Sequence, residues 1–267
     1  MSPTFLESML HATERRLRKL ESERAALQRA AAAVPPGPSW QEALAGPAVA
    51  VVAEIKRRSP SAGPIAERLS PGLHARAYVA GGAAAVSVLT EEAHFGGSLD
   101  DLAEVRRAVA VPLLRKDFVI DEIQLYEARI HGASAVLLVA RALDPVKLRD
   151  LSLAAWALGL LPVVEVHRLE ELEVALRADP GAVGVNARNL DDFSLDREGI
   201  EPILRAVPAG MMAIAESGLG CRADVEQVAA WGADAVLVGT ALAGAARPEE
   251  AVRALTGVAR RGREESK

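Results

Sequence analysis

The chain has 267 residues, half of them hydrophobic and a quarter charged, and a formal net charge of −5, which is an ordinary composition for a globular protein with a large core. The scattered Lys and Arg residues argue against a nucleic-acid partner, and the single cysteine, Cys221, excludes an internal disulfide and favours a reducing compartment. The sequence shows neither a signal-peptide pattern nor an apolar run long enough to span a bilayer, so we expect a cytoplasmic protein without a membrane partner.

Residues 1–48 are predicted to form a helical extension outside the main fold. Residues 5–34 are dense in Glu, Arg, Leu and Ala, and their large apolar residues recur at helical spacings. The PPGPS stretch that follows ends the helix, because proline cannot continue it. We expect this helix to pack on the barrel. A dimerising coiled coil is disfavoured because no heptad pattern is sustained, and we expect a monomer or a weak homo-oligomer.

Residues 49–267 alternate strand-like apolar runs with segments of helical period. Four runs follow a glycine that suits a helix end, about fifty residues apart: GGAAAVSVLTE, HGASAVLLVAR, DPGAVGVNARN and WGADAVLVGTA. Four further runs lie between them: AVVAEIKR, VPLLRKD, LPVVEVH and MMAIAES. Eight strands alternating with helices predict an α/β fold, a single (β/α)8 TIM barrel. The alternative, an open doubly wound sheet, needs a G-x-G-x-x-G turn after the first strand, and AEIKRRSPSAG has none.

Polar residues interrupt the carboxyl ends of several of these runs. Because alternate side chains of a strand share a face, Glu54 and Lys56 share one with the apolar Val52. The same alternation predicts one inward-facing set at the carboxyl end of the barrel: Glu54, Lys56, Lys116, Glu165, Asn186, Arg188 and Glu216. A single charge at a strand end is usually just solvated, but acids and bases from several strands together favour a functional site.

The last two strands are followed by loops that suit a phosphate group. Barrels often bind phosphate with the loops after their seventh and eighth strands. Here these loops contain Ser217 and Gly218, and Gly239 and Thr240, while Ser59 in the first loop can add a hydroxyl. We therefore expect a small phosphorylated substrate.

Other chemistries find little support in the sequence. There is no H-E-x-x-H, no C-x-x-C and no pair of histidines at ligand spacing, so we expect no metal and no cofactor. His94 and His167 lie near predicted loops, where a lone histidine is more often a surface residue. Cys221 lies at a predicted helix start, but it has no base nearby in sequence and is expected to be inert.

Seven motifs, in order over residues 51–242, resemble one family: AEIKRRSPSAG, SVLTEEAHFGGS, PLLRKDFVID, VVEVH, GVNARNL, AESGL and AVLVGTAL. They are similar to those of indole-3-glycerol phosphate synthase, a barrel of tryptophan biosynthesis, and the helical extension also resembles that family's. The resemblance implies a lyase that converts 1-(2-carboxyphenylamino)-1-deoxyribulose 5-phosphate into indole-3-glycerol phosphate, carbon dioxide and water. Ala62, Ala187 and Thr240 depart from the family pattern, but none of them replaces a residue expected to do chemistry.

Carried over by motif, the resemblance implies these catalytic residues: Glu54, Lys56, Lys116, Glu165, Asn186 and Glu216. It implies that substrate and phosphate are bound by Ser59, Phe95, Phe118, Arg188, Ser217, Gly218, Gly239 and Thr240. Ring closure needs an acid at the ketone carbonyl and dehydration needs a base, so we expect Lys116 as the acid and Glu165 as the base. Lys56 would bind the substrate carboxylate or act as the second acid, and the two lysines could exchange roles. Phe95 and Phe118 are expected to pack the aniline ring.

Two other classes of function are weighed against this one. A Schiff-base aldolase-type barrel acting on a sugar phosphate would also use a lysine at a strand end. A non-catalytic barrel kept as a binding partner is disfavoured by the complete charged set. The ending RRGREESK leads us to expect no fused second enzyme.

Overall fold

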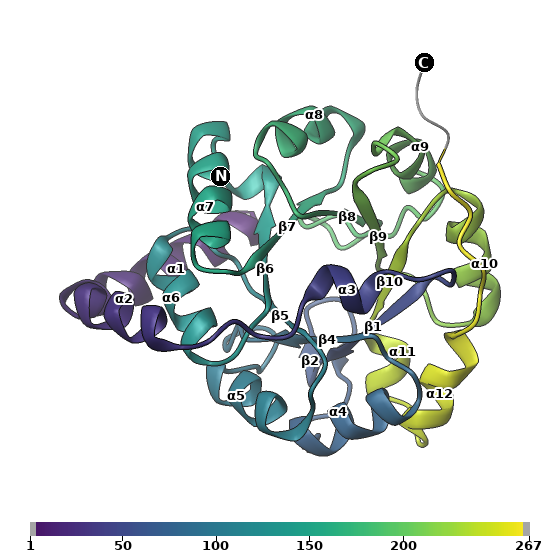
Figure 1. Ribbon diagram of the computed structural model, residues 1–267, viewed down its shortest axis with the longest axis horizontal. Coiled ribbons are helices and arrows are strands. Elements are labelled where there is room, and N and C mark those ends of the chain that lie inside the picture. Colours follow the sequence, from purple (N-terminus) through teal and green to yellow (C-terminus); the bar gives the residue numbers. More distant parts are fainter. Residues whose placement is uncertain (1–3, 264–267) are drawn as a thin grey trace.

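The computed structural model describes residues 4–263, and the last four residues of the RRGREESK ending lie outside them. Eight parallel strands close into one barrel in the order β1-β10-β9-β8-β7-β6-β5-β4 (Figure 1). Their bounds are β1 Ala50–Ile55, β4 Ala85–Leu89, β5 Leu113–Lys116, β6 Ala135–Val139, β7 Leu161–Val166, β8 Ala182–Asn186, β9 Met212–Glu216 and β10 Ala235–Val238. The predicted (β/α)8 barrel is confirmed.

Helices between the strands form the outer layer of the barrel (Figure 1). Their bounds are α4 Pro71–Ala80, α5 Leu99–Ala108, α6 Glu122–Ile130, α7 Pro145–Ala157, α8 Leu169–Arg177, α9 Ile200–Ala206, α10 Arg222–Ala230, α11 Thr240–Ala243 and α12 Pro248–Leu255, with a 3-10 turn, η2, at Ala140–Ala142. The loop after β1 adds a small antiparallel hairpin that the sequence did not predict, between β2 Arg58–Ser59 and β3 Gly63–Pro64.

The strands are apolar on both faces because each face is covered. On β1, Val51, Ala53 and Ile55 belong to the shell between barrel and helices, whereas Val52 belongs to the cluster inside the barrel. This alternation is what a parallel sheet buried on both sides requires. It leaves the carboxyl ends of the strands as the place where an inward polar side chain can remain partly solvated.

At one predicted helix end, a residue other than the expected glycine takes the left-handed conformation. In the DPGAVGV segment Asp179 takes the left-handed conformation, with φ 56, and not Gly181. Gly181 is instead needed for close packing, since a Cβ there would clash with the side chains of Leu161 and Trp156.

The N-terminal extension consists of three helices: α1 Phe5–Leu20, α2 Arg24–Ala33 and α3 Trp40–Leu44. The single helix expected over residues 5–34 is therefore wrong, because a 3-10 turn, η1 Glu21–Glu23, interrupts it. After this turn Arg24 lies 3.0 Å from Asp121, the residue that caps α6, and α1 and α2 both lie beside α6 (Figure 1). The extension thus packs on the barrel, and a domain boundary at residue 48 stays a prediction.

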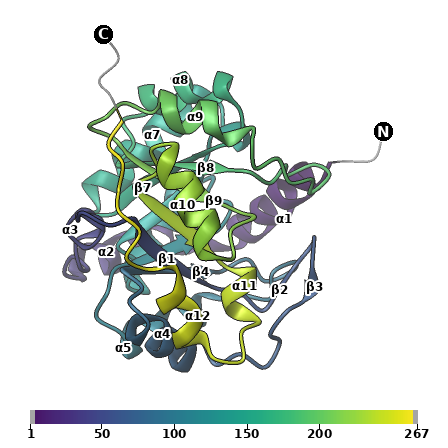
Figure 2. The same ribbon diagram turned by 90° about the vertical axis from the view of Figure 1, so that its right-hand side faces the viewer.

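The two ends of the barrel are closed differently. Trp40 and Leu44 of α3 are buried in the cluster inside the barrel, next to the amino ends of the strands. In Figure 2, α3 lies on one side of the barrel, and α1 and the β2–β3 hairpin lie on the other. The end that remains for a site is the carboxyl end. Within residues 4–263, no helix combines the length and apolar composition of a membrane span.

Candidate active site

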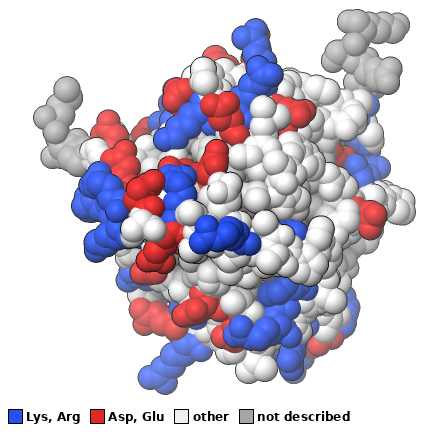
Figure 3. Space-filling view, turned by 60° about the vertical axis from the view of Figure 1, so that its left-hand side comes forward, with Lys and Arg blue, Asp and Glu red and all other residues white. Residues whose placement is uncertain are grey.

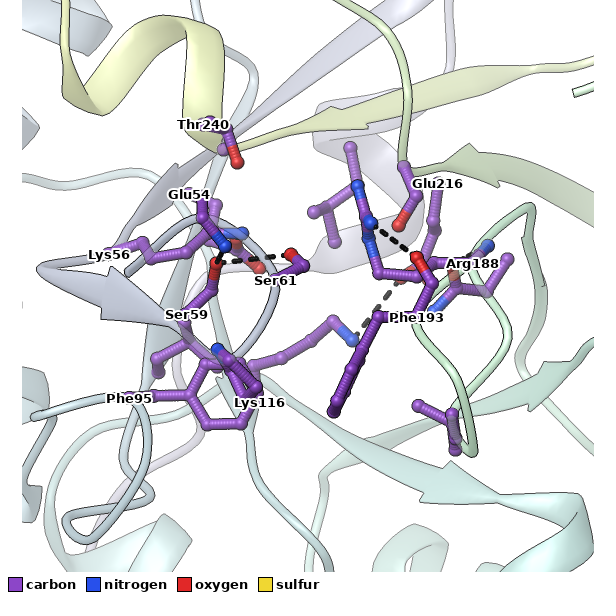
Figure 4. Close-up of a pocket in the computed structure, with 18 of the residues that line it drawn as sticks. Glu54, Lys56, Ser59, Ser61, Phe95, Lys116, Arg188, Phe193, Glu216 and Thr240 are labelled. Carbon is purple, nitrogen blue, oxygen red and sulfur yellow. Dashed lines mark hydrogen bonds and ion pairs between the residues drawn. The ribbon is translucent and has the colours of Figure 1, made fainter. Parts of the chain in front are cut away.

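A cavity of about 520 Å³ opens at the carboxyl ends of the strands (Figure 4). Every residue that the sequence predicted for the site lines it: Glu54, Lys56, Ser59, Phe95, Lys116, Phe118, Glu165, Asn186, Arg188, Glu216, Ser217, Gly218, Gly239 and Thr240. These residues come from strands far apart in the sequence, or from the loops that follow them, and converge because parallel strands present all their carboxyl ends at one face of a barrel. We refer to this space as the active-site cavity.

Lys116 is the cation at the centre of the cavity. Its Nζ lies 2.9 Å from Oε2 of Glu165 and 3.3 Å from Oε2 of Glu216. Burial by itself would lower the pKa of Lys116, but the carboxylates of Glu165, Glu216 and Glu54 outweigh it and raise that pKa above its usual range. The acidic neighbours of Lys116 therefore favour the charged ammonium form.

Glu165 and Glu216 are buried beside the same ammonium group, but their pKa values are shifted in opposite directions. Burial opposes ionisation of both, but Lys116 and His167 together bring the pKa of Glu165 below its usual value. For Glu216, burial and the nearby charge of Glu165 raise the pKa in spite of Lys116. The two directions favour the ionised form of Glu165 and the protonated form of Glu216, so the pair is favoured to hold one shared proton on Glu216.

A second ion pair joins Glu54, near the end of β1, to Lys56, the residue that follows this strand. Glu54 Oε1 is 2.6 Å from Lys56 Nζ, and both side chains are largely buried. Gly239 makes room for this pair, since a Cβ there would clash with the carboxylate of Glu54 and the end of Lys56. The pair holds a second ammonium group facing the same cavity as Lys116.

The loops predicted to hold phosphate lie at the edge of the cavity. Ser217 and Gly218 follow β9 with φ 69 and 71, and α11 begins at Thr240 directly after Gly239. Ser59 is fixed nearby, where its Oγ accepts the backbone N–H of Ala62 at 3.2 Å. Hydroxyls and backbone groups from three loops can therefore contact one anion.

Aromatic rings form the outer wall, and two of them were not predicted. Phe5 of α1 and Phe193 of the loop after β8 both line the cavity, with ring centroids 4.8 Å apart. Arg188 fixes this loop by donating a hydrogen bond to the carbonyl of Phe193 at 2.9 Å. The helical spacing of Phe5 indicated only a packed residue, and the sequence around Phe193 carries no signal. Figure 4 shows Phe95 and Phe193 on either side of Lys116.

The residue next to Lys116 explains the charged end of this strand. Arg115 is almost fully buried and points away from the cavity, where it pairs with Asp117 at 2.8 Å and Glu127 at 3.1 Å. Glu127 also accepts hydrogen bonds from both terminal guanidinium nitrogens of Arg16 on α1. The Arg-Lys-Asp sequence thus combines Lys116, which faces the active-site cavity, with Arg115, which faces outward and anchors the N-terminal extension through Glu127.

The position of His167 corrects a prediction. It was expected on the surface, but its side chain is only 5% exposed and its Nε2 lies 3.4 Å from Oε1 of Glu165. The ring is buried because Glu171 of α8 covers its other side.

Within residues 4–263, no group of three His, Cys, Asp or Glu side chains is arranged to hold a metal ion.

Residues 6–255 match the family model described as indole-3-glycerol phosphate synthase. The chain is 47% identical over 228 residues to the indole-3-glycerol phosphate synthase of Rhodococcus jostii, covering 85% of each chain. It is 47% identical over 242 residues to indole-3-glycerol phosphate synthase 2 of Streptomyces coelicolor, covering 91% of this chain and 93% of the relative.

Solved structures with the same fold are more distant in sequence. The 3-hexulose-6-phosphate synthase of Salmonella typhimurium superposes with a TM-score of 0.61 at 14% identity, covering 78% of this chain and 96% of that one. The thiamine phosphate pyrophosphorylase of Pyrococcus furiosus gives a TM-score of 0.58 at 18% identity, covering 78% and 93%. At this identity the likeness concerns the barrel alone.

Proposed function

The chain belongs to the indole-3-glycerol phosphate synthase family, whose members are decarboxylating lyases of tryptophan biosynthesis. On this basis we propose how the residues of its active-site cavity carry out the reaction. The substrate is 1-(2-carboxyphenylamino)-1-deoxyribulose 5-phosphate, and its conversion relies on general acid and general base catalysis by side chains. The observation that carries the proposal is the contact between Lys116 and Glu165, an acid and a base 2.9 Å apart in one cavity.

Ring closure is assigned to Lys116. The aromatic carbon that bears the carboxylate bonds to the ketone carbon, and the ketone oxygen takes the proton of Lys116 and becomes a hydroxyl. Carbon dioxide then leaves, and its bonding electrons restore the aromatic ring. An ammonium group already placed in a largely buried cavity stabilises the developing negative charge without rearrangement, which is a large source of rate enhancement.

Dehydration is assigned to Glu165 together with a second acid. A C–H bond beside the ring nitrogen breaks and its proton passes to Glu165, while the hydroxyl leaves as water with a proton from Lys56. Glu54 holds Lys56 in place through the 2.6 Å ion pair. The protonated Glu165 can return its proton to Lys116 across their direct contact, and Lys56 regains its proton from solvent, because loss of the carboxylate as carbon dioxide consumes one proton per turnover.

The remaining contacts bind the substrate. The phosphate is assigned to the loops with Ser217 and Gly218, Gly239 and Thr240, and to Ser59. The aniline ring is assigned to the aromatic wall. A cytoplasmic location is proposed from the single cysteine, together with a monomeric or weakly associating state.

A Schiff-base aldolase fits this geometry less well. An imine-forming lysine must lose its proton to become a nucleophile, and enzymes achieve this by lowering its pKa. The pKa of Lys116 is raised by its carboxylate neighbours, which keeps it protonated.

The test follows indole formation by fluorescence after mixing enzyme and substrate in a single turnover. Lys116→Ala should slow ring closure by about 100-fold or more, since general acid catalysis supplies about 10²- to 10⁴-fold. Lys56→Ala should leave ring closure faster than dehydration, and Lys147→Ala, at an exposed position on α7, serves as the control. Near-normal ring closure in Lys116→Ala would overturn the role of this lysine, and no indole from the folded wild-type protein would overturn the function.

A further inference from the structure

His167 occupies an unusual position behind the active-site base. It directly follows β7, and its two ring nitrogens face two carboxylates: Nε2 is 3.4 Å from Glu165 and Nδ1 is 3.7 Å from Glu171. Both nitrogens are buried, and neither has a hydrogen-bond partner among the described residues. The backbone N–H of His167 donates to Glu171 at 2.7 Å, which anchors this segment to α8.

The imidazole lies beside only one of the two carboxyl groups that share Lys116. Glu165 and Glu216 each contact Lys116 through Oε2, and each side chain is 2% exposed. Lys116 attracts both, but only Glu165 accepts its hydrogen bond, at 2.9 Å, so the ammonium group favours ionisation of Glu165 to some extent. A further difference lies at the second oxygen, since Oε1 of Glu165 faces His167, while Oε1 of Glu216 is buried without a hydrogen-bond partner in the described part of the chain.

We propose that His167 is a positioning residue that makes Glu165, and not Glu216, the ionised carboxylate of the site. The inference rests on the proposed function, in which Glu165 is the base. With Nε2 of His167 3.4 Å from Oε1 and Lys116 2.9 Å from Oε2, the carboxyl group of Glu165 lies between an imidazole and an ammonium group. Because Glu216 has no such second partner, the shared proton is held there.

The other charged groups around His167 agree with this role. Those that face it or line the adjoining cavity, of about 220 Å³, are Glu165, Glu171, Arg141, Arg168 and Asp196. Arg141 is itself paired with Asp191 at 2.6 Å. The acidic groups nearest to the ring are thus Glu165 and Glu171, one at each ring nitrogen. The adjoining cavity is lined in part by His167, which does not line the active-site cavity.

The test measures kcat and KM against pH for the wild type and for His167→Gln and His167→Phe. Without the imidazole, Glu165 should ionise only at higher pH, so the acidic limb of the kcat profile should move upward in pH. We expect kcat near neutral pH to fall about 10- to 100-fold, the range typical of a misplaced catalytic group, while KM changes little. His11→Gln, on the exposed face of α1, is the matched control and should retain the wild-type profile.

Two further arms separate positioning from simple loss of packing. In a Glu216→Gln background no second carboxyl competes with Glu165 for the proton. The substitution His167→Gln should therefore shift the acidic limb of the kcat profile less in this background than it does in the otherwise wild-type protein. In His167→Ala, imidazole added to the buffer can enter from the adjoining cavity and should restore part of kcat. N-methylacetamide, which has no imidazole ring, should restore none.

The outcomes are distinguishable. Wild-type turnover with an unchanged profile in the His167 variants, or with a loss of kcat that is equal at every pH and not rescued by imidazole, overturns the inference and leaves the proposed function intact. A folded wild-type protein that makes no indole overturns both. A raised acidic limb together with imidazole rescue supports the positioning role.

Discussion

At the scale of single residues, the shared proton sets the charge balance of the site. The active-site cavity gathers the carboxyls of Glu54, Glu165 and Glu216 around the ammonium groups of Lys56 and Lys116. With a proton on Glu216, two carboxylates face two ammonium groups and this group of side chains is neutral. An ionised Glu216 would add a buried, uncompensated charge, which is costly at so low an exposure.

Replacing Glu216 by Gln should therefore change how stability depends on pH. The pKa of Glu216 is raised by the fold, so its contribution is fully present below the ordinary carboxyl pKa and is lost as pH rises toward the folded-state value. Because Gln does not ionise, the variant should gain stability relative to the wild type as pH increases from 5 to 9. Urea unfolding at several pH values measures this difference. Glu14→Gln, at an exposed position on α1, should show no such trend, and a constant difference for Glu216→Gln would contradict the assignment of the proton.

At the scale of elements, the charged network behind β5 ties the N-terminal extension to the barrel. Arg16 of α1, Glu127 of α6 and Arg115 of β5 form one chain of contacts, of which only Arg16 is substantially exposed. The same helix α1 contributes Phe5 to the wall of the active-site cavity. Attachment of the extension and the shape of the site are thus linked through one helix.

Removing the charge of Glu127, the acid at the centre of this network, should lower the free energy of unfolding strongly. Glu127→Gln leaves the buried Arg115 with one charged partner fewer, and breaking a buried pair in this way costs about 3–5 kcal/mol. Arg16→Met removes a partner whose side chain is 37% exposed, and should cost about 1 kcal/mol or less after screening by solvent. Urea midpoints of the two variants give the comparison, and equal losses would show that Glu127 does not serve Arg115.

The strands and helices also show which features of the structure could be predicted from the sequence. Strand periodicity predicted the inward direction of Lys116 and Glu165, because a strand buried on both faces leaves a charged side chain few places to go. It said nothing of the partners of Arg115, since one of the residues in its network, Arg16, lies 111 positions from Glu127 in sequence. The 3-10 turn at Glu21–Glu23 and the place of Phe193 also depend on long-range packing, which local patterns do not encode.

At the scale of the whole molecule, the active-site cavity lies at the carboxyl ends of the strands, and the amino ends are closed by packing and ion pairs that take no part in it. Acidic and basic side chains are interspersed on the face seen in Figure 3, and the charges that the mechanism uses are gathered inside the active-site cavity. The amino ends of the strands are closed by α3 and by the C-terminal segment, where Val49 and Arg260 donate backbone hydrogen bonds to Val258 and Pro47, both at 2.8 Å. Residues at this end should matter for folding and little for turnover.

Asp234, just before β10, allows this separation to be tested. Its carboxylate pairs with Arg260 and, at 2.9 Å, with Arg263, and it accepts the backbone N–H of Ala213 at 2.8 Å. Asp234→Asn keeps the shape and the acceptor for Ala213 but removes the charge that faces the two arginines, so we expect the free energy of unfolding to fall by about 3 kcal/mol. At temperatures where the variant stays folded, kcat and KM should equal those of the wild type, because the site lies at the other end of the strands. A change in kcat/KM without a loss of stability would mean that the two ends of this barrel are coupled.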